Sequence, residues 1–368
     1  MAKVNRRNLL SGSLAALALG AVPGKLMAEE IRLRPEPGIA RLSANENPYG
    51  PSPRALVAAQ RAVEHGAYYP GPIQQDLLAM IAEHNGLDMV HLAISSGSNE
   101  ALCAAMAAYG KKGRILAPGL TYSPHLRYAE KIGVEVVRVD LAADMSIDLP
   151  AMAKRAEQGD ISLVYICNPN NPTGMLLDAQ ALRTFCRQMS GQSVVLVDEA
   201  YNELTDDPQG NSMVDLVREG EPVMVMRTFS KIFALAGLRV GYTMAPPELA
   251  EALRNHVMAW PNVAGLAAAV ASYSDEAFIA FSRKQIREGR QLVCGVFDRH
   301  EVPYLPSQTN FVYADIGRDA TEFAARMLEH KVRIRPAYAP YNNYSRVSMG
   351  KMKDLETFAR VFDEVYAG

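Results

Sequence analysis

The chain has 368 residues, of which 49% are hydrophobic and 21% charged, and its formal net charge is −2. This composition fits a soluble globular protein of one large or two moderate domains, which can bury a core without disulfides or metals. The small net charge and the lack of a basic tract argue against a nucleic-acid partner or a stable association with membranes.

The first 28 residues differ from the rest of the chain. An arginine pair, Arg6 and Arg7, precedes the apolar run Leu9–Val22, and the segment ends at the small residue Ala28. The run is shorter than the roughly 20 apolar residues that span a bilayer, and this order of features is typical of a secretory signal peptide. The arginine pair resembles the twin-arginine export signal. We expect residues 1–28 to be removed on export to the periplasm; a frayed N-terminus on a cytoplasmic protein is the alternative. The segment carries four basic residues and no acid, so the remainder has a net charge of −6.

Cysteine and histidine spacing gives no sign of a disulfide framework or a metal site. The cysteines form no CxxC pair, and the seven histidines form no HxH or HExxH motif. Cysteines within apolar stretches are usually small buried hydrophobes. The four are Cys103, Cys167, Cys186 and Cys294.

Short apolar, β-branched runs alternate with helical segments from about residue 61 onward. Such runs are expected of strands buried on both faces of a mainly parallel sheet. The predicted strands are Leu92–Ser95, Arg114–Leu116, Val134–Val139, Leu163–Cys167, Val194–Val197, Val223–Met226 and Val240–Met244. The predicted helices between them are Asn99–Tyr109, Pro124–Ile132, Pro150–Glu157 and Ala179–Met189. The pattern predicts an α/β fold with seven strands between helices.

The pattern changes after Trp260. A long helix over about 276–300, short strands near 310–314, 332–335 and 346–348, and a last helix predict a smaller α+β domain. We predict an N-terminal arm over 29–60 that joins this small domain, a large domain over 61–262 and the small domain over 263–368.

Lys231 lies in the most informative segment of the chain. It follows the strand-like run Val223–Met226, lies next to Ser230 with Thr228 close by, and precedes Arg239 by eight positions. A lysine in this setting can form a Schiff base with an aldehyde while hydroxyls and a guanidinium bind a phosphate. A capping serine followed by a surface lysine is the ordinary alternative for a Ser-Lys pair.

Three further motifs follow predicted strands. Gly97-Ser98-Asn99 opens a helix, where free backbone N–H groups and the helix dipole favour an anion. The string Asn-Pro-Asn-Asn-Pro-Thr-Gly over 168–174 fixes a tight turn. Asp198 lies at the carboxyl end of a buried strand, where ligands bind in open α/β sheets.

These motifs, in this order, resemble the pyridoxal-phosphate (PLP) aminotransferases of fold type I, above all the histidinol-phosphate aminotransferase family. The resemblance covers about residues 40–365. It implies a cofactor bonded to Lys231, with Asp198 at the pyridinium nitrogen, Tyr122 stacked on the ring, and Asn171 and Tyr201 at the ring oxygen. It also implies a phosphate site made by Ser98, Asn99, Thr228, Ser230 and Arg239.

The same resemblance assigns residues outside this group. Tyr69 is implied to reach the cofactor phosphate of the neighbouring subunit, which predicts a homodimer. Asn47 lies in a signature, residues 42–50, that is implied to cover the substrate. Arg346 is implied to bind the substrate carboxylate through a two-point fork, with Arg335 as a second anion contact. We interpret Glu199 as a structural neighbour of Asp198.

The predicted activity is transfer of an amino group between an α-amino acid, or a close analogue, and a keto acid, with Lys231 as the proton-transfer group. A PLP-dependent decarboxylase or lyase on the same scaffold is one alternative, and a non-catalytic PLP-binding protein is another. The tyrosine-rich stretch 337–344 matches no pattern for imidazole or phosphate recognition, so the amino donor and acceptor are not predicted.

Overall fold

The computed structural model describes residues 36–367. The predicted signal peptide, 1–28, lies outside the described residues. Ala40–Gly368 forms one compact unit, and the division into a large and a small domain stays a prediction.

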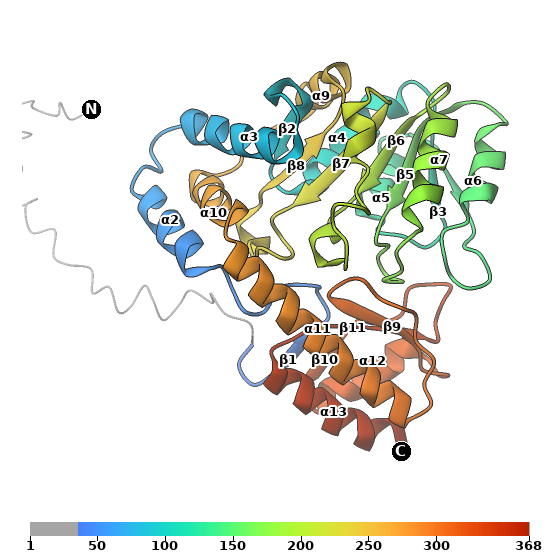
Figure 1. The fold of residues 1–368 in the computed structure, drawn as a ribbon. Helices are drawn as coiled ribbons and strands as arrows, with labels where there is room; N and C mark the ends of the chain where they lie inside the picture. Colours follow the sequence, from blue (N-terminus) through green and yellow to red (C-terminus); the bar gives the residue numbers. More distant parts are fainter. Residues whose placement is uncertain (1–35, 368) are drawn as a thin grey trace, which may run out of the picture. The chain divides into compact units, whose positions relative to one another are not determined.

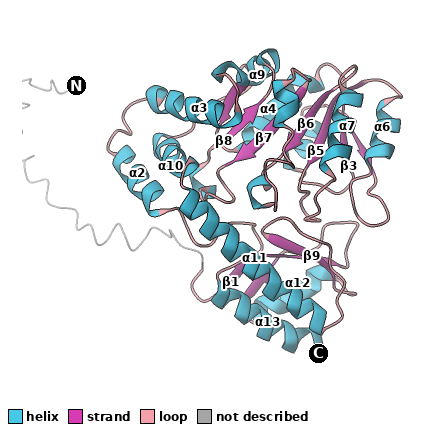
Figure 2. Cartoon of the chain, viewed as in Figure 1, coloured by secondary structure: helices cyan, strands magenta, loops and turns pink. Residues whose placement is uncertain are grey.

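Seven strands form the central sheet, in the order β2-β8-β7-β6-β5-β3-β4 (Figures 1 and 2). The pairs among β7, β6, β5, β3 and β4 are parallel, whereas β8 is antiparallel to both of its neighbours. The strands are β2 (Leu92–Ser95), β3 (Arg114–Pro118), β4 (Val136–Val139), β5 (Ile161–Cys167), β6 (Val194–Asp198), β7 (Val223–Thr228) and β8 (Gly241–Met244). The predicted α/β fold with a mainly parallel, seven-stranded sheet is confirmed.

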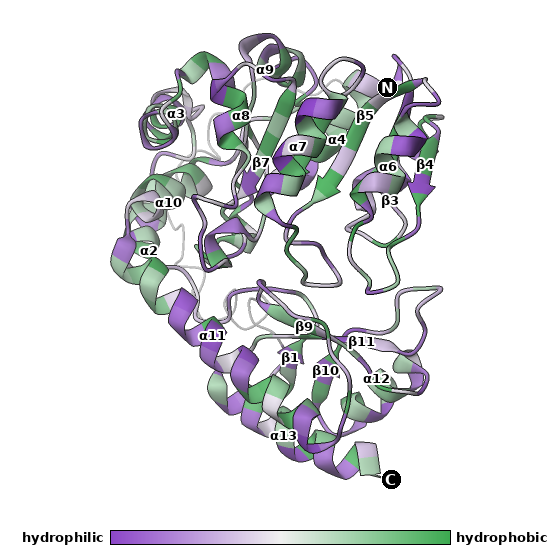
Figure 3. Cartoon of the chain, turned by 45° about the vertical axis from the view of Figure 1, so that its right-hand side comes forward, coloured by the Kyte–Doolittle hydropathy of each residue, from purple (hydrophilic) through white to green (hydrophobic). Residues whose placement is uncertain are grey.

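The central strands are apolar because helices cover both faces of the sheet. Side chains alternate along β6: Val195 and Val197 pack in one core cluster, and Leu196 packs in the other. In Figure 3 the strands are coloured hydrophobic while the outer side of α7 (Ala179–Met189) is largely hydrophilic. Most polar groups of these strands therefore lie near the strand ends.

Helices α4 to α7 agree with the sequence prediction within one residue at each end. They are α4 (Ser98–Gly110), α5 (Pro124–Lys131), α6 (Leu149–Ala156) and α7. The helices α2 (Pro53–Val63), α3 (Gly71–Asn85), α8 (Val214–Arg218), α9 (Pro247–Arg254) and α10 (Val263–Tyr273) have no counterpart in that prediction. Two of them have weak signals: α8 has five residues, and α10 is apolar on nearly all sides, which hides a helical period.

Two small sheets lie beyond the central one. In the first, β1 (Ala40–Leu42) pairs in parallel with β10 (Val332–Ile334); in the second, β9 (Phe311–Asp315) pairs antiparallel with β11 (Tyr344–Ser348). The accompanying helices are α11 (Glu276–Arg299), α12 (Ala320–Glu329) and α13 (Met352–Ala367). Figure 1 shows α11 running from the large sheet toward them. A strand from the start of the described chain, β1, therefore pairs with a strand near the C-terminus, β10.

Within residues 36–367, no single helix is long and apolar enough to cross a membrane, and only the sharply bent pair α10 and α11 meets that test by length and composition.

Candidate active site

A cavity of about 490 Å³ lies where β5, β6 and β7 end. Asp198 and Thr228 are the last residues of β6 and β7, and both line the cavity. Twelve of the predicted site residues line it: Ser98, Asn99, Tyr122, Asn171, Asp198, Tyr201, Thr228, Ser230, Lys231, Arg239, Arg335 and Arg346. The motifs spread over 250 residues of sequence are thus brought together in one place.

Two predicted residues lie elsewhere. Asn47 is buried, and its Nδ2 donates to the carbonyl oxygen of Ile232 at 2.9 Å and to Ser282 Oγ at 3.0 Å. The neighbouring Asn45 lines the cavity instead. Tyr69 is 82% exposed, and its ring packs edge-to-face on Trp260 with 5.1 Å between centroids.

One end of the cavity has the features of an anion site. Helix α4 begins there at Ser98, and Thr228 Oγ1 donates to Ser230 Oγ at 2.9 Å. Arg239 Nη1 lies 3.4 Å from Ser230 Oγ. Gly97 adopts φ 82°, a backbone conformation that residues with a side chain rarely adopt, and the Arg239 guanidinium lies where a Cβ would be. Hydroxyls, a guanidinium and a helix N-terminus together suit a phosphate.

The cavity wall also carries a buried carboxylate, Asp198. Its Oδ2 accepts from Tyr165 Oη at 3.1 Å, and its Oδ1 accepts from the backbone N–H of Ala200 at 3.1 Å. Burial raises the pKa of Asp198 to about 6, although both hydrogen bonds and Lys231 oppose the shift. An anion in this position is the group that a protonated pyridine nitrogen needs. Tyr165 looks like an ordinary core residue in the sequence, and its role was missed.

Tyr201 Oη accepts two side-chain hydrogen bonds. Asn45 Nδ2 donates at 3.1 Å and Asn171 Nδ2 at 3.3 Å. Burial raises the pKa of the Tyr201 phenol, so the hydroxyl stays protonated. Asn45 adopts φ 54°, in the left-handed region that asparagine tolerates better than most residues. Within the signature 42–50, Asn45 thus lines the cavity and Asn47 does not, and the substrate role of Asn47 stays a prediction.

Lys231 lines the same cavity. Its Nζ donates to the Asn45 carbonyl oxygen at 3.1 Å and lies 5.3 Å from the centroid of the Tyr201 ring. Burial and then the Arg346 guanidinium lower the pKa of Lys231 from 10.5 to about 8, against the opposing pull of Asp198. A lowered pKa makes more of the neutral amine, which is the nucleophilic form.

Two arginines, Arg346 and Arg335, also line the cavity. Arg346 is buried; its Nη1 donates to Asn171 Oδ1 at 2.8 Å and its Nη2 to the Ser43 carbonyl oxygen at 2.7 Å. Its Nε is buried with no hydrogen-bond partner, and burial lowers its pKa. The Arg335 guanidinium lies 5.2 Å from the ring centroid of Tyr338, a cavity residue that the sequence prediction missed within the tyrosine-rich stretch.

These residues fit PLP by the chemistry of their groups. The cavity offers donors for a phosphate, an amine that can bond to an aldehyde and a carboxylate for a ring nitrogen. No group of three or more His, Cys, Asp or Glu in the described part of the chain could hold a metal ion.

The fold and this site define a PLP-dependent enzyme of fold type I. Residues 37–362 match the family described as aminotransferase class I and II, and the chain belongs to this family. It is 36% identical over 352 residues to a histidinol-phosphate aminotransferase of Moorella thermoacetica, with 94% of this chain and 90% of that protein covered. It is 34% identical over 378 residues to histidinol-phosphate aminotransferase 2 of Pseudomonas fluorescens, with 97% and 100% covered.

A solved structure supports the same conclusion. The histidinol-phosphate aminotransferase of Sinorhizobium meliloti in complex with PLP matches with a TM-score of 0.82 and 30% identity, over 89% of this chain and 91% of that one. The protein is a PLP-dependent aminotransferase, and the predicted cofactor, enzyme class and family are confirmed. These relatives are named as aminotransferases, not as decarboxylases, lyases or regulators. The roles of individual residues stay predictions.

The lowered pKa of Lys231 predicts how apoprotein takes up PLP. Because the neutral amine reacts, the rate of covalent uptake should rise with pH up to about 8 and then level off. The absorbance change after mixing apoprotein with PLP, followed above the Asp198 pKa of about 6, measures this rate. A free lysine analogue, with a pKa of about 10.4, is the control. A protein rate that keeps climbing beyond about pH 9, as the analogue's does, would contradict the lowered pKa.

Proposed function

We propose that the enzyme transfers the amino group of an α-amino acid, or a close analogue, to a keto acid, and that Arg346 binds the substrate's anionic group. The observation that supports this is the position of Arg346. It is a buried guanidinium in the cavity wall, hydrogen-bonded to Asn171, with its Nε still without a partner. An arginine can hold a carboxylate at two points in a plane.

The other site residues have separate tasks in this proposal. PLP, when bound, supplies an aldehyde and a ring that accepts electrons. Asp198 keeps a proton on the ring nitrogen, and Tyr122 packs against the ring. Asn171 and Tyr201 hydrogen-bond the ring oxygen. The phosphate is bound by Ser98, Asn99, Thr228, Ser230 and Arg239.

Lys231 is the proposed acid and base. Its Nζ would take a proton from the substrate's α-carbon and deliver it to the cofactor's aldehyde carbon. The lowered pKa suits this role, because a base that works near neutral pH needs a pKa close to it.

A second candidate substrate is an amino alcohol phosphate, and histidinol phosphate is the one in the names of the relatives. Arg335 favours it, because this guanidinium stacks on Tyr338 and donates no side-chain hydrogen bond to the described residues. Arg335 and Arg346 together could receive a phosphate in place of a carboxylate.

Substituting Arg346→Lys tests the assignment. Lysine keeps the charge but loses the two-point contact, so KM for amino and keto acids alike should rise about tenfold or more, a loss of about 1.4 kcal/mol. The measurement is a steady-state panel of amino acids, keto acids and histidinol phosphate. Arg326→Lys, at an exposed position of α12, is the control. Unchanged KM values would remove Arg346 from the substrate site, and a phosphate substrate that outperforms every amino acid would favour the second candidate.

We propose that the enzyme works as a homodimer. Four large side chains cluster on its surface, around cavities near the start of α3 and before α10: Tyr68, Tyr69, Met258 and Trp260, which are 75%, 82%, 92% and 62% exposed. Exposed apolar groups of this size mark protein–protein contact sites. A second copy of the chain would cover them and bring Tyr69 of the partner subunit to the cofactor phosphate.

Complementation tests the shared site. Lys231→Ala and Tyr69→Ala should each be nearly inactive alone. Because each site would need both residues from different subunits, a mixture in equal amounts has one intact site in half of its dimers, so activity should recover to about a quarter of wild type. Refolded or co-expressed mixtures are assayed against each parent. No recovery from a dimeric mixture would mean that Tyr69 acts within its own subunit or not at all.

We propose export to the periplasm through the segment 1–28, supported by its arginine pair, apolar run and small terminal residue. Twin-arginine transport carries folded proteins, so PLP could be bound before export.

The substitution Arg6→Lys with Arg7→Lys should leave an uncleaved precursor in the cytoplasm, because that pathway reads the arginine pair. Cell fractionation and the mass of the product measure this. Equal periplasmic yield from the wild type and the double variant would rule out twin-arginine transport.

A further inference from the structure

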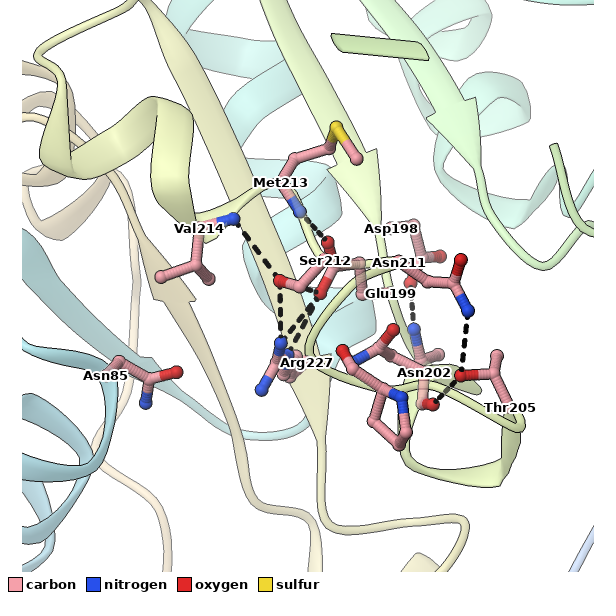
Figure 4. Close-up of polar contacts among 12 residues, drawn as sticks. Asn85, Asp198, Glu199, Asn202, Thr205, Asn211, Ser212, Met213, Val214 and Arg227 are labelled. Carbon is pink, nitrogen blue, oxygen red and sulfur yellow. Dashed lines mark hydrogen bonds and ion pairs between the residues drawn. The ribbon is translucent and has the colours of Figure 1, made fainter. Parts of the chain in front are cut away.

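A buried ion pair, Glu199 and Arg227, lies behind the cofactor site (Figure 4). Arg227 Nε and Nη2 donate to Glu199 Oε2 at 3.0 and 2.9 Å. The two side chains are only 1% and 9% exposed, for Glu199 and Arg227 respectively. Neither residue lines the 490 Å³ cavity.

The pair occupies the opposite face of the sheet from the cofactor contacts. Side chains alternate between faces along a strand, and Asp198 and Thr228 both point into the active-site cavity. Arg227 instead lines a second cavity of about 760 Å³. Each member of the pair is the direct chain neighbour of a proposed cofactor contact, because Glu199 follows Asp198 and Arg227 precedes Thr228.

Backbone pairing between β6 and β7 stops before Thr228 is reached. Pairing of β6 with β7 ends at Asp198 and Met226, and the last hydrogen bond runs from the Glu199 N–H to the Met226 carbonyl oxygen at 2.8 Å. β7 continues to Thr228, which there pairs with Gly241 of β8. The ion pair therefore adds a side-chain link between β6 and β7 beyond their last shared backbone hydrogen bond.

A serine and a backbone amide hold the pair in place. Ser212 Oγ donates to Glu199 Oε2 at 2.9 Å and accepts from Arg227 Nη2 at 2.8 Å. The Met213 N–H donates to Glu199 Oε1 at 2.7 Å. Both carboxylate oxygens are thus occupied, which leaves the Glu199 side chain little freedom to reorient.

We propose that Glu199 and Arg227 are a positioning pair that sets the spacing between Asp198 and Thr228. Through them the pair sets the distance between the groups that receive the ring nitrogen and the phosphate of one rigid cofactor. The inference rests on the proposed roles of Asp198 and Thr228. Groups that bind a ligand must be held to within about 0.5 Å, which gives such a spacing its effect on affinity.

The competing explanation is that the pair only stabilises the fold. Removing one member leaves a buried charge unpaired and destabilises the protein, whereas neutralising both members is often tolerated. The informative variant is therefore Glu199→Gln with Arg227→Met. Glutamine keeps the shape of glutamate and can still accept from the Met213 N–H and donate to Ser212 Oγ.

The experiment compares the binding of PLP and of pyridoxal, which lacks the phosphate, to full-length apoprotein. If the pair sets the spacing, the double variant should unfold near the wild-type urea midpoint but bind PLP about tenfold more weakly. Pyridoxal, which engages only one end of the site, should change much less. Equilibrium dialysis gives both dissociation constants, and their ratio reports the spacing independently of turnover.

Control variants separate the explanations. Arg187→Met with Glu219→Gln neutralises another Arg–Glu pair, at 2.6 Å between α7 and the end of α8, and should leave the ratio unchanged. If the ratio of the PLP and pyridoxal dissociation constants in the Glu199 and Arg227 double variant equals that of the wild type, the proposal is wrong. If that variant does not fold, Arg227→Lys keeps the charge without the two-point contact, and the same ratio decides. Asp198→Asn serves as the reference variant. If this variant binds PLP as tightly as the wild type, Asp198 does not bind the ring nitrogen. The inference about spacing would then be wrong because its premise is wrong, whatever the ratio in the double variant.

Discussion

Helices cover both faces of the three parallel strands β5, β6 and β7, so a ligand can reach their polar side chains only where the strands end. This constraint places the active site. Cys167, Asp198 and Thr228 are the final residues of the three strands and all line one cavity. The loops that follow add Asn171, Tyr201 and Lys231. The chemistry therefore depends on strand register, which the core fixes.

The charged side chains in the cavity lie where the opposite charges of a bound ligand could pair with them. Burial raises the pKa of Asp198 to about 6 and lowers that of Lys231 to about 8, so both groups move toward their neutral forms. A pyridinium beside Asp198 would restore its charge, and a phosphate beside Arg239 would offset the guanidinium. A cofactor bound as proposed would thus offset the electrostatic cost of building a polar site inside a protein.

The sequence predicted most of this because local signals carry it. Continuous β-branched runs mark the sealed strands, and each motif directly follows one, as with Asp198 after β6. What escaped prediction depends on contacts between distant residues. Tyr165 has the sequence pattern of a core residue, and only the structure shows that its hydroxyl donates to Asp198. Asn45 and Asn47 lie in the same motif, and only the structure shows that Asn45 is the one that bonds to Tyr201, 156 positions away. Tyr338 has no neighbouring motif, and the five-residue α8 is too short to show a period.

The arm that begins with β1 is as much a part of the site as the strands are. β1 pairs with β10, and within a few residues the Ser43 and Asn45 carbonyl oxygens accept from Arg346 and Lys231. The residues that line the cavity begin at Ser43. A change in the chain ahead of Ala40 would therefore leave every described residue of the cavity wall in place. A protease that trims past this point, by contrast, would remove the backbone that holds the reactive lysine.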